Sequence, residues 1–558
     1  MLTITRLIRF ITGLLVAFGL GFKGLAQTAP TWQSAQTMGS PWSFGVVKAG
    51  SSAVDGAGNF YEVGNFSGTN ATVVGGMTLT APVGSANSIF IAKYTADGRL
   101  AWLRQLNGAG WIESKKVAVD ASGHVYVVGF SSNKEIDLGN GVKLAGGTDD
   151  RAFIVRYSPE GVAEWAQQAT PRSVGHGVGF DAAGNVYFSG FFYSNTTIGG
   201  QSISSPGTNT TFLARLSAET GAVQSLVPTF YYTPPASGPG TYVETGLAIG
   251  ADGRAYLTTS FSLPVTFSST TTLRPRGTRD GLVACYSPQG RFEWARQFRG
   301  QKVAVPGKAT PDAAGNVYVA GFVDGAATFD AIVPFGAGNF LAKYSPQGAI
   351  QWVRADEGTS TGGWSRVCLD EAGNPYVVGS ITGAASFGSV KLISAGKTDI
   401  AVASYSPQGD LRWAQSAGSV DSDWGQDISV TGGTVYMIGR FSSTCSFGNQ
   451  TLSTATLSPT APSSETFIAR LGTSVLATQA ARSTTISIYP NPATDQVQLL
   501  GLPSGSQVSL VDALGRLART SVLTAEGKVS VIGLKPGLYS LQATDQQGQT
   551  YRSRLVIH

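Results

Sequence analysis

A tyrosine-bearing motif recurs at a nearly constant interval along most of this chain. The stretch VAVDASGHVYVVG, residues 117–129, returns as VGFDAAGNVYFSG, ATPDAAGNVYVAG and VCLDEAGNPYVVG. Successive tyrosines are 65, 61, 69, 62, 58 and 60 residues apart. The seven tyrosines are Tyr61, Tyr126, Tyr187, Tyr256, Tyr318, Tyr376 and Tyr436. A period of this kind indicates one structural unit repeated seven times.

Each unit is interpreted as two hairpins, which predicts four strands, and most units carry one or both of two turn signatures. The first, Asp-x-x-Gly-Asn, joins an apolar strand to the tyrosine strand, because Asp accepts hydrogen bonds from turn amides and Gly and Asn tolerate positive φ. The second, Ser-Pro-x-Gly, joins a third strand to a fourth that usually bears a tryptophan, such as Trp165. We interpret the aspartates of the first turn as structural turn residues: Asp55, Asp120, Asp181, Asp312 and Asp370. Calcium is the alternative, but it needs six to eight oxygens and this turn supplies too few.

The repeat predicts an all-β, seven-bladed β-propeller over residues 27–473, with four-stranded blades. Strands such as residues 153–155 are apolar on both faces, which indicates a sheet packed between two neighbours. After Phe467 the last unit lacks its tryptophan strand, while an unassigned strand of that kind, residues 31–35, precedes the first unit. We expect this N-terminal strand to complete the seventh blade and close the ring, which removes two raw sheet edges.

The two motifs together resemble a known repeat family. The pattern VxVDxxGNVYVxGxF followed by FxAKYSPxGxxxWA is similar to the SBBP repeat of seven-bladed β-propellers, over roughly residues 31–471. The resemblance implies the same propeller fold. It implies no particular activity, because the family is mostly uncharacterised.

Residues 1–26 have the pattern of a secretory signal peptide. Arg6 and Arg9 precede the apolar run 10–22, and Gly24 and Ala26 provide small residues for cleavage before Gln27. The apolar run is too short for a transmembrane helix, so we expect no integral membrane span.

Charge and motif content narrow the classes of function. The chain has 39 basic and 34 acidic residues, but the excess lies in the leader and the tail, so residues 27–485 carry no net charge. Nucleic acid is therefore not an expected partner. The three cysteines, Cys285, Cys368 and Cys445, lack metal-ligand spacing and are interpreted as small buried side chains, with a disulfide between two of them left open. We expect no metal, no other cofactor and no catalytic residue.

Aromatic residues in the variable loops opposite the aspartate turns are the candidate ligand-binding residues. Loops of variable sequence on a rigid scaffold commonly carry binding sites, and exposed rings could stack on sugars. The alternative, that these rings pack between blades as core, remains open at this point. The candidates are Trp111, Tyr231, Tyr232, Trp364 and Trp424.

A different domain follows a small polar linker at residues 474–485. Short alternating strands with Gly and Pro turns over residues 486–558 predict a small Ig-like β-sandwich. Its motifs resemble the C-terminal sorting domain of the type IX (Por) secretion system. The matching residues are Pro490, Asn491, Pro492, Gly515, Gly537 and Tyr539. The resemblance implies that the type IX machinery is a partner, and that the protein is secreted or lies on the outer-membrane surface of a Gram-negative bacterium.

The sequence thus favours a secreted or cell-surface, non-enzymatic binding protein whose ligand is a polysaccharide or a surface protein. One alternative is a glycan hydrolase or lyase built on a propeller, which would need convergent carboxylates or a metal. A structural role in the cell coat is the other.

Overall fold

The computed structural model describes residues 29–42, 47–66, 72–81, 87–107, 110–232, 246–329, 336–358, 362–454, 464–472, 484–485, 488–499, 502–512, 516–545 and 550–558. The predicted signal peptide, 1–26, lies outside these ranges. Every regular element within them is a β-strand, and they contain no helix long and apolar enough to cross a membrane. The chain divides into two compact units, Met1–Thr473 and Ser474–His558.

The described part of the first unit contains seven antiparallel sheets of four or more strands, numbered here in chain order, and each has a core of four strands. This confirms an all-β chain of four-stranded sheets. From first to fourth strand, sheet 1 consists of β2 (Val47–Val54), β3 (Phe60–Phe66), β6 (Ser88–Tyr94) and β7 (Leu100–Leu106). Sheet 2 consists of β8 (Gly110–Val119), β9 (Val125–Asn133), β12 (Arg151–Tyr157) and β13 (Ala163–Gln168). Sheet 3 consists of β14 (Ser173–Phe180), β15 (Val186–Phe192), β18 (Thr208–Leu216) and β19 (Val223–Tyr232).

The next three sheets follow the same plan, except that the first strand of sheet 5 is in two pieces. Sheet 4 consists of β20 (Gly246–Ile249), β21 (Ala255–Phe261), β24 (Asp280–Tyr286) and β25 (Phe292–Arg299). Sheet 5 consists of β26 (Ala304–Pro306) with β27 (Thr310–Pro311), then β28 (Val317–Val323), β30 (Gly338–Tyr344) and β31 (Ile350–Ala355). Sheet 6 consists of β33 (Trp364–Leu369), β34 (Pro375–Ile381), β37 (Asp399–Tyr405) and β38 (Leu411–Ala417).

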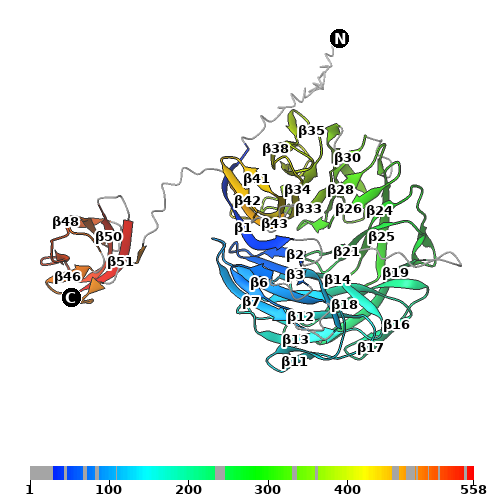
Figure 1. The fold of residues 1–558 in the computed structure, drawn as a ribbon, viewed down its shortest axis with the longest axis horizontal. Coiled ribbons are helices and arrows are strands. Elements are labelled where there is room, and N and C mark those ends of the chain that lie inside the picture. Colours follow the sequence, from blue (N-terminus) through cyan, green and yellow to red (C-terminus); the bar gives the residue numbers. More distant parts are fainter. Residues whose placement is uncertain are drawn as a thin grey trace, which may run out of the picture. The chain divides into compact units, whose positions relative to one another are not determined.

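Sheet 7 combines strands from the two ends of the repeat region. Its first three strands are β39 (Trp424–Thr431), β40 (Thr434–Ser442) and β43 (Ser464–Gly472), and its fourth is β1 (Thr31–Trp42). Thr31 pairs with Gly472 and the two strands run antiparallel. Figure 1 shows the blue β1 beside the yellow strands that end the repeat region.

The link between the second and third strand folds into an additional short hairpin in six of the repeats. The prediction of four strands per repeat was therefore incomplete. In repeat 4 this hairpin also pairs with the fourth strand of the preceding sheet, since β22 bonds to β19. The hairpins are β4 (Thr72–Val74) with β5 (Met77–Leu79), β10 (Ile136–Gly139) with β11 (Val142–Leu144), β16 (Asn195–Ile198) with β17 (Gln201–Ser204), β22 (Val265–Ser268) with β23 (Thr271–Leu273), β35 (Ala384–Phe387) with β36 (Val390–Ile393), and β41 (Thr444–Phe447) with β42 (Gln450–Ser453). Two shorter pieces, β29 (Thr328–Phe329) and β32 (Glu357–Gly358), pair with β25 and β35.

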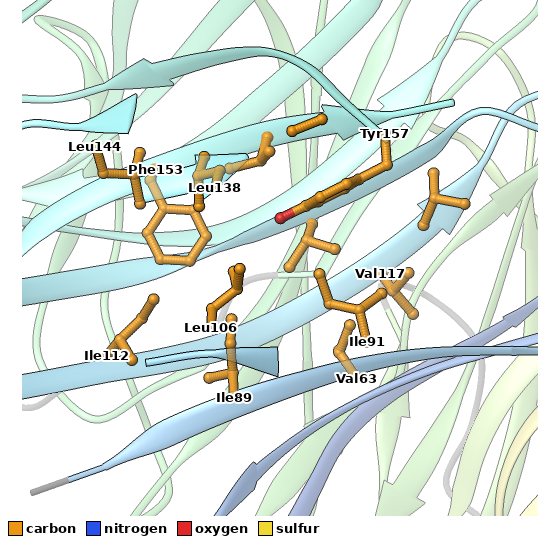
Figure 2. Close-up of a cluster of buried hydrophobic side chains, with 14 of the residues drawn as sticks. Val63, Ile89, Ile91, Leu106, Ile112, Val117, Leu138, Leu144, Phe153 and Tyr157 are labelled. Carbon is orange, nitrogen blue, oxygen red and sulfur yellow. The ribbon is translucent and has the colours of Figure 1, made fainter. Parts of the chain in front are cut away.

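The hydrophobic core lies between neighbouring sheets. Figure 2 shows the layer between sheets 1 and 2, where Ile91 of β6 belongs to the same buried cluster as Phe153 of β12 and Leu138 of the β10–β11 hairpin. Ile154 points the other way, into the layer between sheets 2 and 3, which explains why this strand is apolar on both faces. Each fully buried side chain of this size contributes about 1.5–3 kcal/mol.

Equivalent layers lie between every successive pair of sheets. One further layer joins sheet 7 to sheet 1, where Tyr436 and Ile468 pack with Phe60 and Phe90.

The tryptophan of the fourth strand contacts the Ser-Pro-x-Gly turn of the next repeat. Trp294 Nε1 donates to the carbonyl oxygen of Pro346 at 2.9 Å, and Arg296 Nε donates to that of Gly348 at 2.7 Å. Gly348 has φ +78°, and a Cβ there would lie 2.5 Å from the Trp294 ring. The turn glycine is thus required twice, for its backbone conformation and for close approach to the indole. The same indole contact recurs at Trp102, Trp165 and Trp352.

The second unit has two sheets around its own core. Val497 and Val529 from one sheet pack against Leu510, Leu541 and Leu555 from the other. One sheet has the order β44 (Thr484–Thr485), β51 (Thr550–Ile557), β50 (Gly537–Thr544), β47 (Gln507–Asp512), β48 (Leu517–Val522), and the other β45 (Ile488–Tyr489), β46 (Gln496–Leu499), β49 (Lys528–Ser530).

Candidate functional site

One cavity of about 370 Å³ is lined by the first strands of all seven sheets. We call it the central cavity. Its lining comes from β2, β8, β14, β20, β27 with the residues just before it, β33 and β39. Because every repeat contributes one strand, side chains from distant parts of the sequence meet there.

Seven equivalent positions form one level of these strands. In repeats 1 to 6 the position lies four residues before the first turn, and in repeat 7 it lies five residues before it. In sheets 1, 2, 3, 6 and 7 a register shift of the kind a β-bulge makes immediately precedes it. A bulge changes the direction of the following side chain, and bulges are common beside binding sites. The seven residues at this level are Ser51, Lys116, Gly177, Gly246, Lys308, Arg366 and Asp427.

Four of these residues are charged and line the central cavity; we call them the charged tier. Asp427 accepts from Arg366 Nη2 at 2.8 Å, and Lys116 Nζ lies 3.7 Å from the same Asp427 oxygen. The other Asp427 oxygen accepts the Ile428 amide at 2.9 Å. Lys308 lies on the strand next to Arg366 but makes no ion pair with any described residue. The tier therefore sets three basic groups against one carboxylate.

Burial and mutual repulsion shift the pKa values of these groups. Burial, with the Arg366 charge, lowers the pKa of Lys116 well below its ordinary value and that of Lys308 to about 8. Burial alone would raise the pKa of Asp427, but Arg366, Lys116 and Lys308 outweigh it and lower that pKa. Asp427 is therefore ionised near neutral pH, and the two lysines lack the counter-charge that would hold their protons more firmly.

Small residues form the next level of the cavity. They lie two positions beyond the charged tier, so they point to the same side of each strand. They are Ala53, Ala118, Gly179, Ala248, Thr310, Cys368 and Ser429. Their size leaves the volume below the charged tier open, so this end of the cavity is apolar or weakly polar.

The described lining of the cavity offers three basic groups and few acidic or nucleophilic ones. Its described lining contains one carboxylate, Asp427, whereas a glycosidase uses two. Burial raises the pKa of the Cys368 thiol, which opposes nucleophilic attack by it. Throughout the described ranges no group of three or more His, Cys, Asp or Glu residues could hold a metal ion. Cys285, Cys368 and Cys445 are all free.

The candidate aromatic residues separate into exposed and buried rings. Trp111 is 44% exposed and Trp424 40%. Trp364 is 3% exposed and its ring packs on Phe387, with centroids 5.6 Å apart. Tyr232 is buried beside Phe230, and Tyr231 is half-buried. Trp364 and Tyr232 thus present no free ring face for a sugar.

The two exposed tryptophans begin strands whose later residues form the charged tier. Trp111 is the second residue of β8, which carries Lys116, and Trp424 is the first residue of β39, which carries Asp427. Trp111 Nε1 donates to Glu113 at 3.2 Å, and Glu113 pairs with Lys115 at 2.6 Å. The structure therefore brings these rings to the end of the cavity-lining strands that is opposite the aspartate turns.

The five turn aspartates are occupied within their own turns. In repeat 3, Asp181 Oδ1 accepts the amides of Ala183 and Asn185 at 3.0 and 2.9 Å, and Oδ2 accepts the Asn185 side chain and the Tyr187 hydroxyl. Both amide bonds recur at Asp55, Asp120, Asp312 and Asp370. The tyrosine that defines the repeat is thus a partner of the aspartate in most repeats.

The sorting-motif residues hold the last strand of the second unit. Asn491 donates from Nδ2 to the carbonyl oxygen of Arg554 and accepts the Val556 amide, both at 2.8 Å. The Tyr539 hydroxyl donates to the carbonyl oxygen of Lys535 at 2.8 Å. Pro490 and Pro492 flank Asn491 and Gly537 begins β50, whereas Gly515 lies outside the described residues.

The charged tier was not among the residues predicted from the sequence. A signal was present, since Lys116, Lys308 and Arg366 each stand four residues before a turn aspartate. Recognising the charged tier from the sequence requires aligning the repeats with one another and knowing that this position faces the central cavity.

Comparison with known proteins identifies the C-terminal unit. Residues 487–558 match the family of secretion system C-terminal sorting domains, which confirms the predicted sorting domain. No curated protein matches the chain. Among solved structures, a protein of unknown function from Bacteroides caccae is 11% identical, with 59% of this chain and 89% of that chain covered and a TM-score of 0.30.

Two other solved structures show equally distant likeness. The extracellular domain of a one-component system protein from B. thetaiotaomicron is 11% identical, with 92% of this chain and 87% of that chain covered and a TM-score of 0.22. An apocarotenoid oxygenase mutant from Synechocystis is 11% identical, with 74% and 88% covered and a TM-score of 0.31. The sorting domain therefore carries the identification: this is a protein that a member of the Bacteroidetes secretes or displays at its cell surface.

Proposed function

We propose that the first unit is a closed seven-bladed β-propeller built from SBBP-type repeats. Three observations support a closed ring. β1 supplies the fourth strand of sheet 7, a hydrophobic layer joins sheet 7 to sheet 1, and the first strands of all seven sheets line one cavity. The pairing of β1 covers the edge of β43 that the last repeat would otherwise leave open.

We propose that this propeller is a non-enzymatic binding module for a polysaccharide or a surface protein. The observation that carries the proposal is the position of Trp111 and Trp424, exposed rings at the start of two strands that line the central cavity. An exposed indole offers an apolar face for stacking at small entropic cost, and a cavity beside it adds polar contacts.

We also propose the route by which the protein leaves the cell. Residues 1–26 would direct it to the periplasm, and the sorting domain would engage the type IX machinery for passage across the outer membrane. Removal of residues 486–558 is expected to leave the protein in the periplasm, measured by fractionation and immunoblotting. Appearance of the truncated protein in the medium would contradict this route.

The binding function is tested with the full chain against a set of polysaccharides, following binding and product release together. We expect binding without product release, weakened at least ten-fold by Trp111→Ala or Trp424→Ala. Ile393→Ala is the control, because Ile393 is 63% exposed on the β35–β36 hairpin. Product release would establish the enzymatic alternative. Absence of both would leave a protein partner or a structural role in the cell coat.

A further inference from the structure

We propose that the central cavity binds one oxyanion, a carboxylate or sulfate carried by a small ligand, through Lys116, Lys308 and Arg366. The inference rests on the proposed binding function and deepens it, because it names the chemistry of the group that is recognised.

The first argument is the charge imbalance of the charged tier. Lys116 and Asp427 have side chains 17% exposed and Arg366 14%. Charges with so little access to water are costly unless they are paired. Three basic side chains share a single carboxylate, so an anion entering the cavity would supply the missing counter-charge.

The second argument is that Asp427 is already fully engaged. One of its oxygens serves both Arg366 and Lys116, and the other accepts the Ile428 amide. The Nε atom of Arg366 is buried and has no hydrogen-bond partner among the described residues. Lys308 also has no partner there. A planar or tetrahedral oxyanion could accept from both, since arginine and lysine are the preferred donors to such groups.

The third argument is size. A volume of about 370 Å³ is at the lower end of the roughly 300–1,000 Å³ that ligand pockets occupy. The small residues below the charged tier leave this space unfilled, and they give it walls of low polarity. A uronic acid or a sulfated monosaccharide at a chain end has the required combination of one anionic group and a compact body.

The test is calorimetric titration of the full chain at low ionic strength with sodium glucuronate, sodium sulfate and glucose. We expect saturable binding of glucuronate and sulfate in competition with each other, and none of glucose, which lacks the carboxylate. Glucuronate binding tighter than sulfate would identify the uronate as the source, and the reverse order the sulfate ester.

Two substitutions move the affinity in opposite directions. Lys308→Gln is expected to weaken glucuronate binding about ten-fold, whereas Asp427→Asn removes the competing carboxylate and is expected to strengthen it by a similar factor. Lys391→Gln is the control, since Lys391 is exposed on β36. A gain of affinity in Asp427→Asn cannot arise from misfolding, so the proposal remains testable if one variant is unstable.

The pH dependence of anion affinity tests the role of Lys308 independently. Lys308 faces Arg366, Lys116 and Asp427, and its pKa of about 8 predicts weaker anion binding at pH 9 than at pH 7. Lys308→Arg should retain its affinity at pH 9. Absence of anion binding, or equal affinities in Lys308→Gln, Asp427→Asn and the control, would overturn the proposal. If the protein binds a polysaccharide but no anion, the proposed oxyanion site is wrong and the proposed polysaccharide-binding function stands. If it binds an anion but no polysaccharide, the oxyanion site stands and a polysaccharide is not the ligand.

Discussion

Tyr187 and Tyr318 occupy the same position in repeats 3 and 5, but their hydroxyl groups have different surroundings. The Tyr187 hydroxyl donates to Asp181 at 3.2 Å. The Tyr318 hydroxyl is buried without a hydrogen-bond partner among the described residues. Comparing the two sites therefore separates the contribution of the hydroxyl hydrogen bond to stability from that of the buried ring, which both sites share.

We expect Tyr187→Phe to lower the free energy of unfolding by about 1–2 kcal/mol, because a hydrogen bond to a carboxylate is lost. Tyr318→Phe removes an unsatisfied buried hydroxyl and is expected to leave stability unchanged or to raise it. Urea unfolding of both variants measures the difference. Equal losses would show that the aspartate contact contributes nothing.

Buried carboxylates predict how stability depends on pH. Burial raises the pKa of Asp356 to about 7, and Glu62 and Asp423 reach similar values. Between about pH 4 and 7 the folded protein then binds more protons than the unfolded chain, so stability falls as pH rises through this window. Asp356→Asn should make that fall shallower, measured by urea unfolding from pH 5 to 8. Asp97→Asn, at an exposed site, should leave the slope unchanged; an unaltered slope in Asp356→Asn would be the contrary result.

At the scale of elements, the contact between a fourth-strand tryptophan and the next turn joins neighbouring sheets. Gly348 has φ +78° and Gly373 φ +77°, so alanine meets nearly the same backbone strain at each. At Gly348 the added carbon would lie 2.5 Å from the Trp294 ring, whereas Gly373 has no atom within 4 Å. The pair isolates the contribution of indole packing.

Gly348→Ala is accordingly expected to destabilise the protein by about 1–3 kcal/mol more than Gly373→Ala, because the turn must move away from the indole. Thermal unfolding of the two variants measures this difference. Equal melting temperatures would mean that the turn shifts without cost.

Turns and repeats could be predicted from the sequence because they repeat the same residues, but the site could not. Trp364 and Trp424 look equivalent in sequence, yet Trp364 pairs opposite Gly379, three residues after its repeat tyrosine, and Trp424 opposite Arg440, four residues after its own. One step of register places the two rings on opposite faces of their strands. The extra hairpins had a signal in Gly pairs such as Gly75-Gly76. The residue at the level of the charged tier differs among the repeats, and in five of the seven sheets its direction follows a register shift that the sequence does not reveal.

At the scale of the whole molecule, β1 is the strand on which closure of the proposed ring depends. Its antiparallel register with β43 extends from Thr31 to Trp42. Without it, β43 would present unpaired backbone groups to a second molecule.

Deletion of residues 27–42 is expected to increase association into larger oligomers or aggregates relative to the intact protein, followed by size exclusion with light scattering. A synthetic peptide of residues 31–42 should reduce this association by occupying the edge. A monomeric deletion variant with an unchanged melting temperature would show that the ring does not need β1.

The pairing of Thr31 with Gly472 also sets an order of events during biosynthesis. The first strand of the unit has its partner among the last residues of the repeat region, so sheet 7 cannot form until nearly the whole unit has been synthesised. Until then the backbone groups of β1 lack their partners in β43. Completion of sheet 7 is therefore a late event in the folding of this unit.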